Sequence, residues 1–124
     1  MPKKVDFLIV GSGIAGLTFA TNSAQYGQIL ILTKKNSADS NTNYAQGGIA
    51  SVFSDTDSFD CHINDTIKVG EGVSHQDAVK IMVENGPKLV SKLYDKGCRF
   101  TLDDQGNFAL GKEGGHSQRR IVHA

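Results

Sequence analysis

Three glycines near the start of the chain, Gly11, Gly13 and Gly16, stand at the spacing G-x-G-x-x-G. Each position has a physical reason: the first glycine lets the chain turn sharply, the second lets a phosphate approach the backbone, and the third lets the following helix pack closely on a sheet. The unpaired N–H groups at a helix N-terminus also attract phosphate. The spacing alone is a weak signal, so its meaning depends on the elements around it.

The segments that flank these glycines supply the expected context. Residues 5–10 are mostly apolar and rich in β-branched and aromatic side chains, which predicts a strand buried in a parallel sheet. We expect a helix from Ile14 to about Tyr26, with Gly27 as its C-cap, and a second buried strand over residues 29–32. Together they predict a βαβ unit that holds the ADP half of a dinucleotide. The alternative for the same residues is a tight turn without a ligand.

The acidic residue that usually binds the ribose hydroxyls is missing from the end of the second strand. That strand is followed by Thr33, Lys34 and Lys35, and the nearest acid, Asp39, lies several residues beyond it. A basic residue at this place could meet the 2′-phosphate of NADP, or it could be a solvated strand end. The βαβ unit alone therefore leaves NADP and FAD as alternatives.

The rest of the chain predicts further short elements. Residues 36–43 are polar and are expected to form a loop, and residues 60–69 are expected to form a helix. Ser74 has the features of an N-cap, and Pro87 is typical of the first turn of another helix. Two apolar segments within residues 99–110 flank a short polar loop and predict a hairpin.

Composition narrows the function classes further. The 124 residues are 39% hydrophobic and 21% charged with zero net charge, which is typical of one small globular domain and indicates no nucleic-acid or membrane partner. No apolar run approaches the roughly 20 residues that span a bilayer. Cys61 and Cys98 match no metal-ligand spacing, so we expect no metal site. We interpret both as ordinary thiols of a cytoplasmic protein, with a disulfide as the less favoured alternative.

A second glycine-rich segment, residues 40–50, reads SNTNYAQGGIA. Gly47 and Gly48 permit a close approach of the backbone to a flat ring and leave N–H groups free to bind it, while Asn43 and Gln46 offer amide groups. From these residues alone, a surface turn is the favoured interpretation. A third block, EGGHSQRRIVHA at the end of the chain, combines an acid, two histidines and two arginines.

These three blocks resemble the succinate dehydrogenase/fumarate reductase flavoprotein superfamily, in the same order and at family-like spacing. Residues 40–50 resemble its flavin-binding loop, S-x-x-x-x-A-Q-G-G-(I/V)-A. Residues 113–124 resemble a block of one branch, the L-aspartate oxidases, which reads close to R-E-G-G-H-S-x-x-R-I-L-H-A, and Tyr44 also matches that branch. Lys112 departs from the pattern, because many members of this branch have arginine there and lysine lacks its bidentate fork.

The resemblance implies an α/β fold, in which a Rossmann-like FAD-binding βαβ unit with a parallel sheet forms the incomplete N-terminal part of a larger FAD domain over residues 1–124. A capping domain, which supplies the catalytic arginine base, and a C-terminal helical domain would lie outside this chain, so the fragment by itself is expected to be inactive. The implied cofactor-binding residues are Gly11, Ser12, Gly13, Ile14, Ala15, Gly16, Lys34, Asn41, Thr42, Asn43, Tyr44, Ala45, Gln46, Gly47 and Gly48.

The flavin loop also indicates how the cofactor is held. Superfamily members that bind FAD covalently carry a histidine in this loop. The matching position here is Asn41, and an asparagine cannot form that bond. The resemblance therefore implies non-covalent FAD, with Lys34 on the adenosine side of the cofactor rather than at a 2′-phosphate.

The resemblance implies oxidation of L-aspartate to iminoaspartate, the first step of quinolinate and NAD synthesis, with oxygen or fumarate as the electron acceptor and quinolinate synthase as a candidate partner. Glu113 matches the family glutamate that orients the substrate through its ammonium group, for which a carboxylate is the right chemistry. The alternative is an exposed loop glutamate. His116, Arg119 and Arg120 are secondary candidates for carboxylate or phosphate contacts, and His62 is given no role.

Two other functions are compatible with these residues. A soluble fumarate reductase or succinate dehydrogenase-type flavoprotein needs no acid at the position of Glu113, because its dicarboxylate carries no amine. A non-catalytic NADP-binding module that uses Lys34 and Lys35 is the alternative from a different class.

Overall fold

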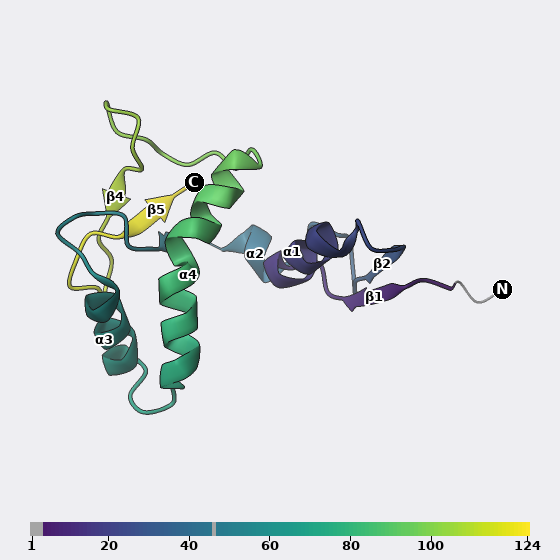
Figure 1. Ribbon diagram of the computed structural model, residues 1–124, viewed down its shortest axis with the longest axis horizontal. Helices are drawn as coiled ribbons and strands as arrows, with labels where there is room; N and C mark the ends of the chain where they lie inside the picture. Colours follow the sequence, from purple (N-terminus) through teal and green to yellow (C-terminus); the bar gives the residue numbers. More distant parts are fainter. Residues whose placement is uncertain (1–3, 46) are drawn as a thin grey trace. The chain divides into compact units, whose positions relative to one another are not determined.

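The computed structural model describes residues 4–45 and 47–124, and it divides into two compact units, the second of which starts at Gly47 (Figure 1). The first unit contains β1 (Phe7–Val10), α1 (Ile14–Ser23), β2 (Ile29–Leu32) and α2 (Asn41–Tyr44). The second contains β3 (Gly48–Ala50), α3 (Phe59–Val69), α4 (Gln76–Asp95), β4 (Leu110–Gly111) and β5 (Ile121–His123). Among the described residues, no helix combines the length and the apolar character needed to cross a membrane.

The first unit is the βαβ unit that the sequence predicts. β1 and β2 pair in parallel, with Phe7 opposite Ile29 and Val10 opposite Leu32. α1 contacts both strands, and Phe7 meets Phe19 edge-to-face with ring centroids 6.1 Å apart. Two short apolar strands joined through a helix give the parallel arrangement expected from their pattern, and the predicted α/β class is confirmed.

Two boundaries in this unit differ from the prediction. β1 begins at Phe7 rather than at residue 5, and α1 ends at Ser23, so Gly27 is not its C-cap. Gly27 instead packs against Asp6, whose carboxylate accepts a hydrogen bond from the N–H of Gln28 at 2.7 Å. A Cβ at position 27 would overlap the Asp6 side chain. This glycine therefore lets the chain pass close to Asp6 before β2 begins.

A short helix, α2, overlaps the end of the loop predicted over residues 36–43. The hydroxyl of Ser40 caps it by accepting a hydrogen bond from the N–H of Asn43 at 3.2 Å. Serine is a strong N-cap residue, but a run of polar residues offers no periodic pattern from which so short a helix could be predicted. The cap holds residues 41–44 in a single turn, and Thr42 within it bonds to the start of α1.

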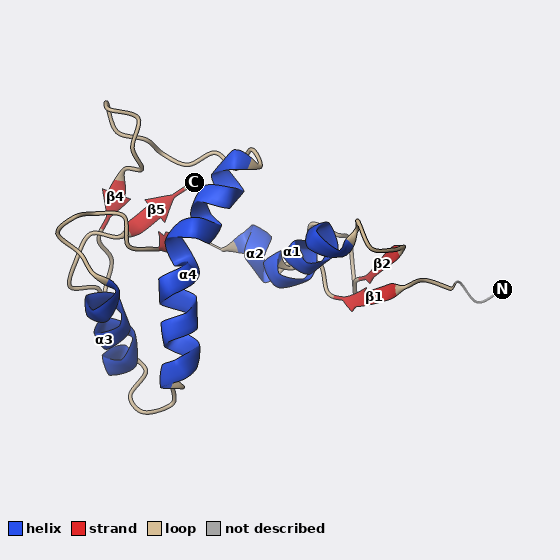
Figure 2. Ribbon diagram, in the orientation of Figure 1, coloured by secondary structure: helices blue, strands red, loops and turns tan. Residues whose placement is uncertain are grey.

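In the second unit, α3 and α4 lie side by side (Figure 2). The predicted helix over residues 60–69 is confirmed, and it begins one residue earlier, at Phe59. Ser58 is its N-cap, because its hydroxyl accepts a hydrogen bond from the N–H of Cys61 at 3.1 Å.

α4 is one helix where the sequence predicts two. Pro87 lies inside it rather than at a helix start. Proline removes an N–H donor and costs roughly 3 kcal/mol in a helix interior. Val79, Val83 and Val90 are at most 7% exposed and form one stripe that continues past the proline. Burial of this continuous face outweighs the missing hydrogen bond.

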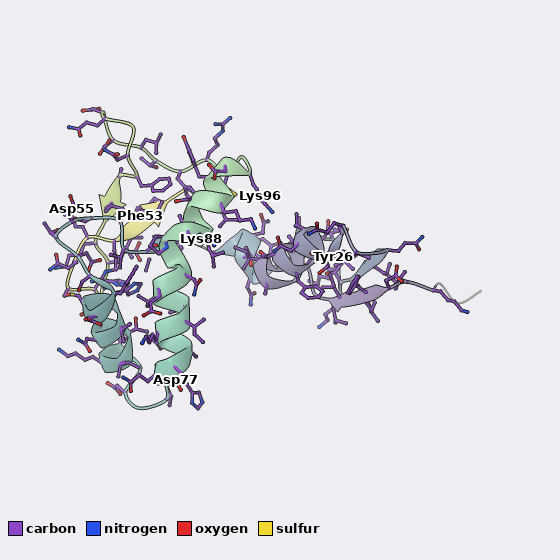
Figure 3. All side chains as sticks on the ribbon, viewed as in Figure 1. Tyr26, Phe53, Asp55, Asp77, Lys88 and Lys96 are labelled. Carbon is purple, nitrogen blue, oxygen red and sulfur yellow. The ribbon has the colours of Figure 1, made fainter. Side chains whose placement is uncertain are left out.

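The ends of α4 carry charges that suit the helix dipole. Its N-cap is His75, whereas the sequence favours Ser74. Asp77 lies in the first turn and Lys96 is the C-cap, and Figure 3 shows these two side chains at opposite ends of the helix. An acid at the N-terminus and a base at the C-terminus each stabilise a helix by roughly 0.3–1 kcal/mol.

A three-stranded antiparallel sheet in the order β3-β5-β4 completes the second unit. Ile49 of β3 and Leu110 of β4 both lie opposite Val122 of the central strand. Val122 is fully buried and Ile121 is nearly so, which places β5 in the core of this unit. The sequence prediction lacks this sheet, because strands of two or three residues are too short to show an alternating pattern.

The hairpin predicted within residues 99–110 is only partly formed. A single isolated bridge joins Leu102 and Phe108. The ring of Phe108 packs edge-to-face against three others, Phe53, Tyr94 and Phe100. Aromatic contacts, and not a regular β-ladder, therefore hold this segment, and a local sequence pattern does not reveal such contacts.

Candidate functional site

The first glycine motif forms a sharp turn from β1 into α1. Gly11 has a φ of +108°, a conformation open to glycine and strained for other residues. A Cβ on Gly16 would collide with the carbonyl oxygen of Gly11 and would lie 3.2 Å from Cγ2 of Ile9. Helix α1 can therefore start this close to the strand only because position 16 has no side chain.

The N-terminus of α1 offers donors to an anion. Its N-cap is Gly13, which supplies no side-chain cap. The N–H of Ile14 donates to Oγ1 of Thr42 at 3.1 Å, whereas no acceptor among the described residues bonds the N–H groups of Ala15 and Gly16. A Cβ on Gly13 would have ordinary room, 3.5 Å from the Thr42 hydroxyl. Two free N–H groups beside an open Cα fit a phosphate group.

A pocket of about 510 Å³ opens at this turn. Ser12 is buried, and its hydroxyl lies 3.2 Å from that of Thr33, which ties the glycine loop to the segment after β2. Asn43 lies in α2, and Ala45 is the C-cap of that helix. The first-unit residues expected at the cofactor that line the pocket are Gly11, Ser12, Gly13, Lys34, Asn41, Thr42 and Tyr44.

An acid also lines this pocket, although the sequence places it well beyond the strand. The carboxylate of Asp39 accepts a hydrogen bond from the hydroxyl of Tyr44 at 2.6 Å. That hydrogen bond raises the pKa of Tyr44 above its ordinary value of 10.0. Lys34 and Lys35 line the same pocket, so the folded chain presents two cations and one acid at this place.

In the second unit, Glu113 lies against the second glycine segment. Gly47 has a φ of +93°, and a Cβ there would lie 3.3 Å from Oε1 of Glu113. A Cβ on Gly48 would collide with the carbonyl oxygen of Val122. Strand β3 can therefore pair this closely with β5 only because position 48 is a glycine. Gln46, also expected to bind the cofactor, lies outside the described residues.

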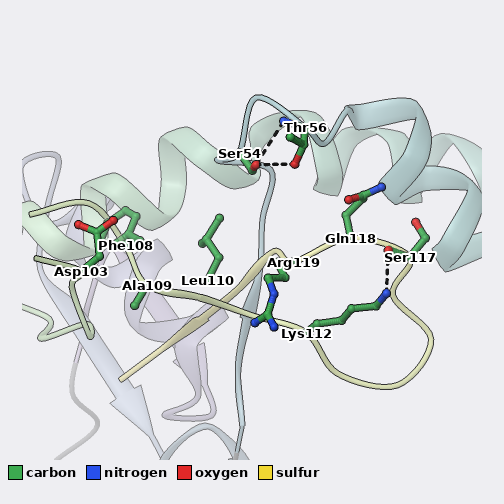
Figure 4. A pocket seen from close by; sticks show the side chains of 10 residues that line it. All are labelled: Ser54, Thr56, Asp103, Phe108, Ala109, Leu110, Lys112, Ser117, Gln118 and Arg119. Carbon is green, nitrogen blue, oxygen red and sulfur yellow. Dashed lines mark hydrogen bonds between the residues drawn. The ribbon is translucent and has the colours of Figure 1, made fainter. Parts of the chain in front are cut away.

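The loop between β4 and β5 carries Glu113 and is closed by its own hydrogen bonds. The N–H of His116 donates to the carbonyl of Glu113 at 3.3 Å. Nζ of Lys112 donates to the carbonyl of Ser117 at 2.9 Å (Figure 4). Arg119 is exposed and lines a pocket of about 550 Å³, drawn in Figure 4. Glu113 is not among the residues that line that pocket.

Arg120 lies in a buried ion cluster rather than at a ligand site. Its side chain has no exposed surface. Nε and Nη2 donate to the two carboxylate oxygens of Asp57 at 2.7 and 2.8 Å, and Nη1 donates to Oδ2 of Asp65 at 2.7 Å. Burial opposes the charge of Arg120, but the hydrogen bonds to Asp57 and Asp65 raise its pKa above the ordinary value. The carboxylate contact considered for Arg120 is therefore made within the chain.

Asp65 belongs to the same ion cluster, and the sequence did not predict it. Its Oδ2 accepts hydrogen bonds from the N–H of Ser117 at 2.8 Å and from the Ser117 hydroxyl at 2.7 Å. Burial opposes its ionisation, but these two bonds and those from Arg120 hold the pKa of Asp65 at about 2. Ser117 is 52 residues away in sequence and Arg120 is 55, so no local spacing could reveal the set.

Two histidines lie beside this cluster. The ring centroids of His62 and His116 are 5.8 Å apart, and Nδ1 of His116 lies 3.4 Å from Nη1 of Arg120. Burial lowers the pKa of His62, and the positive charges of Arg120 and His116 lower it further. His116, considered for a substrate contact, thus lies next to the buried ions.

The low pKa of Asp65 predicts a loss of stability in acid. Its ordinary value is 3.8 and its folded value about 2, so its ionisation stabilises the fold above about pH 4, and this contribution disappears as the pH falls through about 2. We expect the advantage of the wild type over Asp65→Asn in unfolding free energy to be about 2 kcal/mol smaller at about pH 2 than at about pH 5. Chemical unfolding of the flavin-free wild type and of Asp65→Asn at the two pH values measures this difference in unfolding free energy.

Asp60→Asn is the control for this measurement, because Asp60 is an exposed acid in the first turn of the same helix. Its effect on unfolding free energy should change much less over that range. An Asp65→Asn difference that stays constant with pH would contradict the assignment.

The comparisons with known proteins decide between the cofactors left open by the glycine motif. A family model described as an FAD binding domain matches residues 6–124. The chain belongs to the FAD-binding domain family. It is similar to the chloroplastic L-aspartate oxidase 2-a of Nicotiana tabacum, at 44% identity over 96% of this chain and 18% of the relative. It is also similar to the L-aspartate oxidase of Acinetobacter baylyi, at 47% identity over 96% of this chain and 22% of the relative. The chain thus spans about a fifth of the length of these relatives.

Two solved structures share the fold of this chain. A variant of the Escherichia coli quinol fumarate reductase matches with a TM-score of 0.89 and 33% identity, over 95% of this chain and 21% of that one. Mycobacterium smegmatis Sdh1 matches with a TM-score of 0.90 at 24% identity, over 97% of this chain and 21% of that one, and supports the fold alone. The prediction of an FAD-binding α/β fold is confirmed, and FAD rather than NADP is the cofactor. The free N–H groups and bare Cα at the start of α1 fit its pyrophosphate.

Proposed function

We propose that the protein to which this chain belongs oxidises L-aspartate to iminoaspartate with bound FAD. One observation carries the proposal: the Glu113 carboxylate lies against Gly47 in the segment that resembles the flavin loop. An acid beside the flavin can bind the ammonium group that distinguishes aspartate from succinate. The identity of 44–47% to proteins named L-aspartate oxidase supports the same substrate.

We assign different residues of this chain to binding FAD and to orienting the substrate. We assign the pyrophosphate to the N–H groups of Ala15 and Gly16, and the adenosine side to Lys34 in the same pocket. Gly47 and Gly48 allow the backbone to approach the flavin ring, and Glu113 orients the substrate ammonium. When bound, FAD supplies the hydride acceptor, while the chain supplies position and charge.

The product would feed quinolinate and NAD synthesis, and quinolinate synthase is then the proposed partner. Oxygen or fumarate is the proposed electron acceptor. We also propose a cytoplasmic location, although the similar protein of Nicotiana tabacum is named as chloroplastic.

Turnover assays with the protein expressed from its complete gene test this function. We expect L-aspartate to be oxidised in air, and also anaerobically when fumarate is supplied, while succinate is a poor substrate. Oxidation of succinate without oxidation of L-aspartate would overturn the proposal and favour the alternative below.

A soluble fumarate reductase is the second candidate, favoured by the match to the Escherichia coli quinol fumarate reductase at 33% identity. Such an enzyme would transfer electrons to fumarate at a rate that does not depend on Glu113, because fumarate carries no ammonium group. The dependence of each activity on Glu113 therefore separates the two functions.

Asn41 predicts that the flavin is released by acid. An asparagine amide offers no nucleophile comparable to a histidine ring nitrogen for a bond to the flavin, and Asn41 lines the cofactor pocket. After precipitation of the protein with acid, we expect the yellow colour in the supernatant and none in the pellet. Flavin retained in the washed pellet would show a covalent link and refute this prediction.

A further inference from the structure

The loop that carries Glu113 is attached to the rest of the second unit through Ser117. At the start of the loop, Nζ of Lys112 donates to the Ser117 carbonyl at 2.9 Å. Near its end, the N–H and the hydroxyl of Ser117 both donate to Oδ2 of Asp65 in α3, at 2.8 and 2.7 Å. The N–H of His116 donates a hydrogen bond to the carbonyl of Glu113 at 3.3 Å. A short path of hydrogen bonds thus leads from α3 to Glu113.

Asp65 is the fixed end of that path. The same Oδ2 accepts a third hydrogen bond, from Nη1 of Arg120 at 2.7 Å, and Asp57 holds the other two nitrogens of that guanidinium. The side chains of Arg120 and Asp57 have no exposed surface, and that of Asp65 is 17% exposed. Charge-assisted hydrogen bonds of this length are strong and directional. The orientation of Asp65 is therefore set by buried ions and passed on to Ser117.

We propose that Asp65 is a positioning residue that holds Glu113 against Gly47 and thereby sets recognition of the substrate ammonium group. This inference rests on the proposed function. Asp65 acts through Ser117 and its loop rather than by touching the substrate. A misplacement of about 1 Å can cost about a hundredfold in catalysis. Because Glu113 binds the substrate ammonium group and takes no part in the flavin chemistry, we expect a lost anchor to appear in KM rather than in kcat.

Asp57 offers a matched control, because both aspartates neutralise Arg120 but only Asp65 bonds Ser117. For Asp65→Asn we expect KM for L-aspartate to rise about tenfold, with kcat per bound flavin within about twofold of the wild type. For Asp57→Asn we expect an unchanged KM. Reoxidation of the chemically reduced flavin by fumarate should be the same in all three proteins, since fumarate has no ammonium group.

Ser117 gives a second, milder pair of variants. Ser117→Ala removes the hydroxyl contacts to Asp65 and to Sγ of Cys61 but keeps the backbone contact to Asp65, and we expect KM to rise about threefold. Ser117→Thr restores a hydroxyl and should restore KM. If Asp65→Asn fails to fold, the two Ser117 variants still test whether the contact between Asp65 and Ser117 sets KM for L-aspartate.

Three results would overturn the assignment: a wild-type KM in Asp65→Asn, an equal rise in KM in Asp57→Asn, or a wild-type KM in Ser117→Ala. An equal rise would show that the cluster only neutralises Arg120. If the wild type is not reduced by L-aspartate at all, the proposed function fails, and the positioning role fails with it. If the wild type oxidises L-aspartate and the Asp65 and Ser117 variants match it, only the positioning role fails.

Discussion

Replacing Glu113 by glutamine is expected to raise KM for L-aspartate about a hundredfold, because the variant keeps the shape of the side chain and loses its charge. A charge-assisted hydrogen bond to an ammonium group contributes roughly 1.5–3 kcal/mol, and about 2.7 kcal/mol corresponds to a hundredfold change. Steady-state kinetics of the protein expressed from its complete gene measures this effect. Transfer of electrons from the reduced flavin to fumarate should not change.

Glu84→Gln is the control for that variant. Glu84 is an exposed residue of α4, paired at 3.9 Å with Lys80 one helical turn away, and exposed pairs of this kind contribute little. Its kinetics should match the wild type. If Glu113→Gln kept a normal KM for L-aspartate, this exposed glutamate would have no role in substrate binding, and the substrate assignment would lose its main support.

Alanine at Gly13 and alanine at Gly16 are expected to impair FAD binding for different reasons. At Gly13 a Cβ has ordinary room within the chain, 3.5 Å from Oγ1 of Thr42, so any loss must come from the ligand. We expect FAD affinity to fall about a hundredfold, because the methyl group occupies the place where the pyrophosphate approaches the backbone. The thermal stability of the flavin-free protein should fall only slightly, because Gly13 is the N-cap of α1 and alanine is a poorer N-cap than glycine.

At Gly16 a Cβ would overlap the carbonyl oxygen of Gly11 and crowd Ile9. We expect a loss of stability of roughly 1–3 kcal/mol, typical of overpacking, together with weaker FAD binding. Flavin fluorescence titration and thermal unfolding of the two flavin-free variants separate the effects. Equal stability losses in both variants, or full FAD affinity in Gly13→Ala, would be incompatible with a phosphate cradle at this turn.

The parts of the fold that were predictable are those with a strong local pattern. The strand–glycine–helix–strand unit could be read from the sequence because glycine spacing and apolar strands act within a few residues of each other. The same holds for α3, which is predicted nearly to its first residue. For Pro87 the local rule failed, because the buried stripe from Val79 to Val90 continues through it and tertiary burial outweighs one lost hydrogen bond.

The parts that were missed depend on long-range contacts. The β3-β5-β4 sheet pairs Ile49 with Val122, which no short-range pattern reveals. Arg120 was a possible ligand contact in the sequence, yet its partner Asp57 lies 63 residues away, and the Arg120 side chain has no exposed surface. A charged side chain is almost never fully buried without a partner, but the sequence does not say where the partner is.

We propose that this chain contributes to an FAD site at which L-aspartate is oxidised. Anaerobic reduction of the bound flavin tests it most directly, with the protein expressed from its complete gene and mixed with either L-aspartate or succinate. We expect L-aspartate to remove the absorbance of the oxidised flavin and succinate to leave it. Oxidised flavin that persists in excess L-aspartate would contradict the claim.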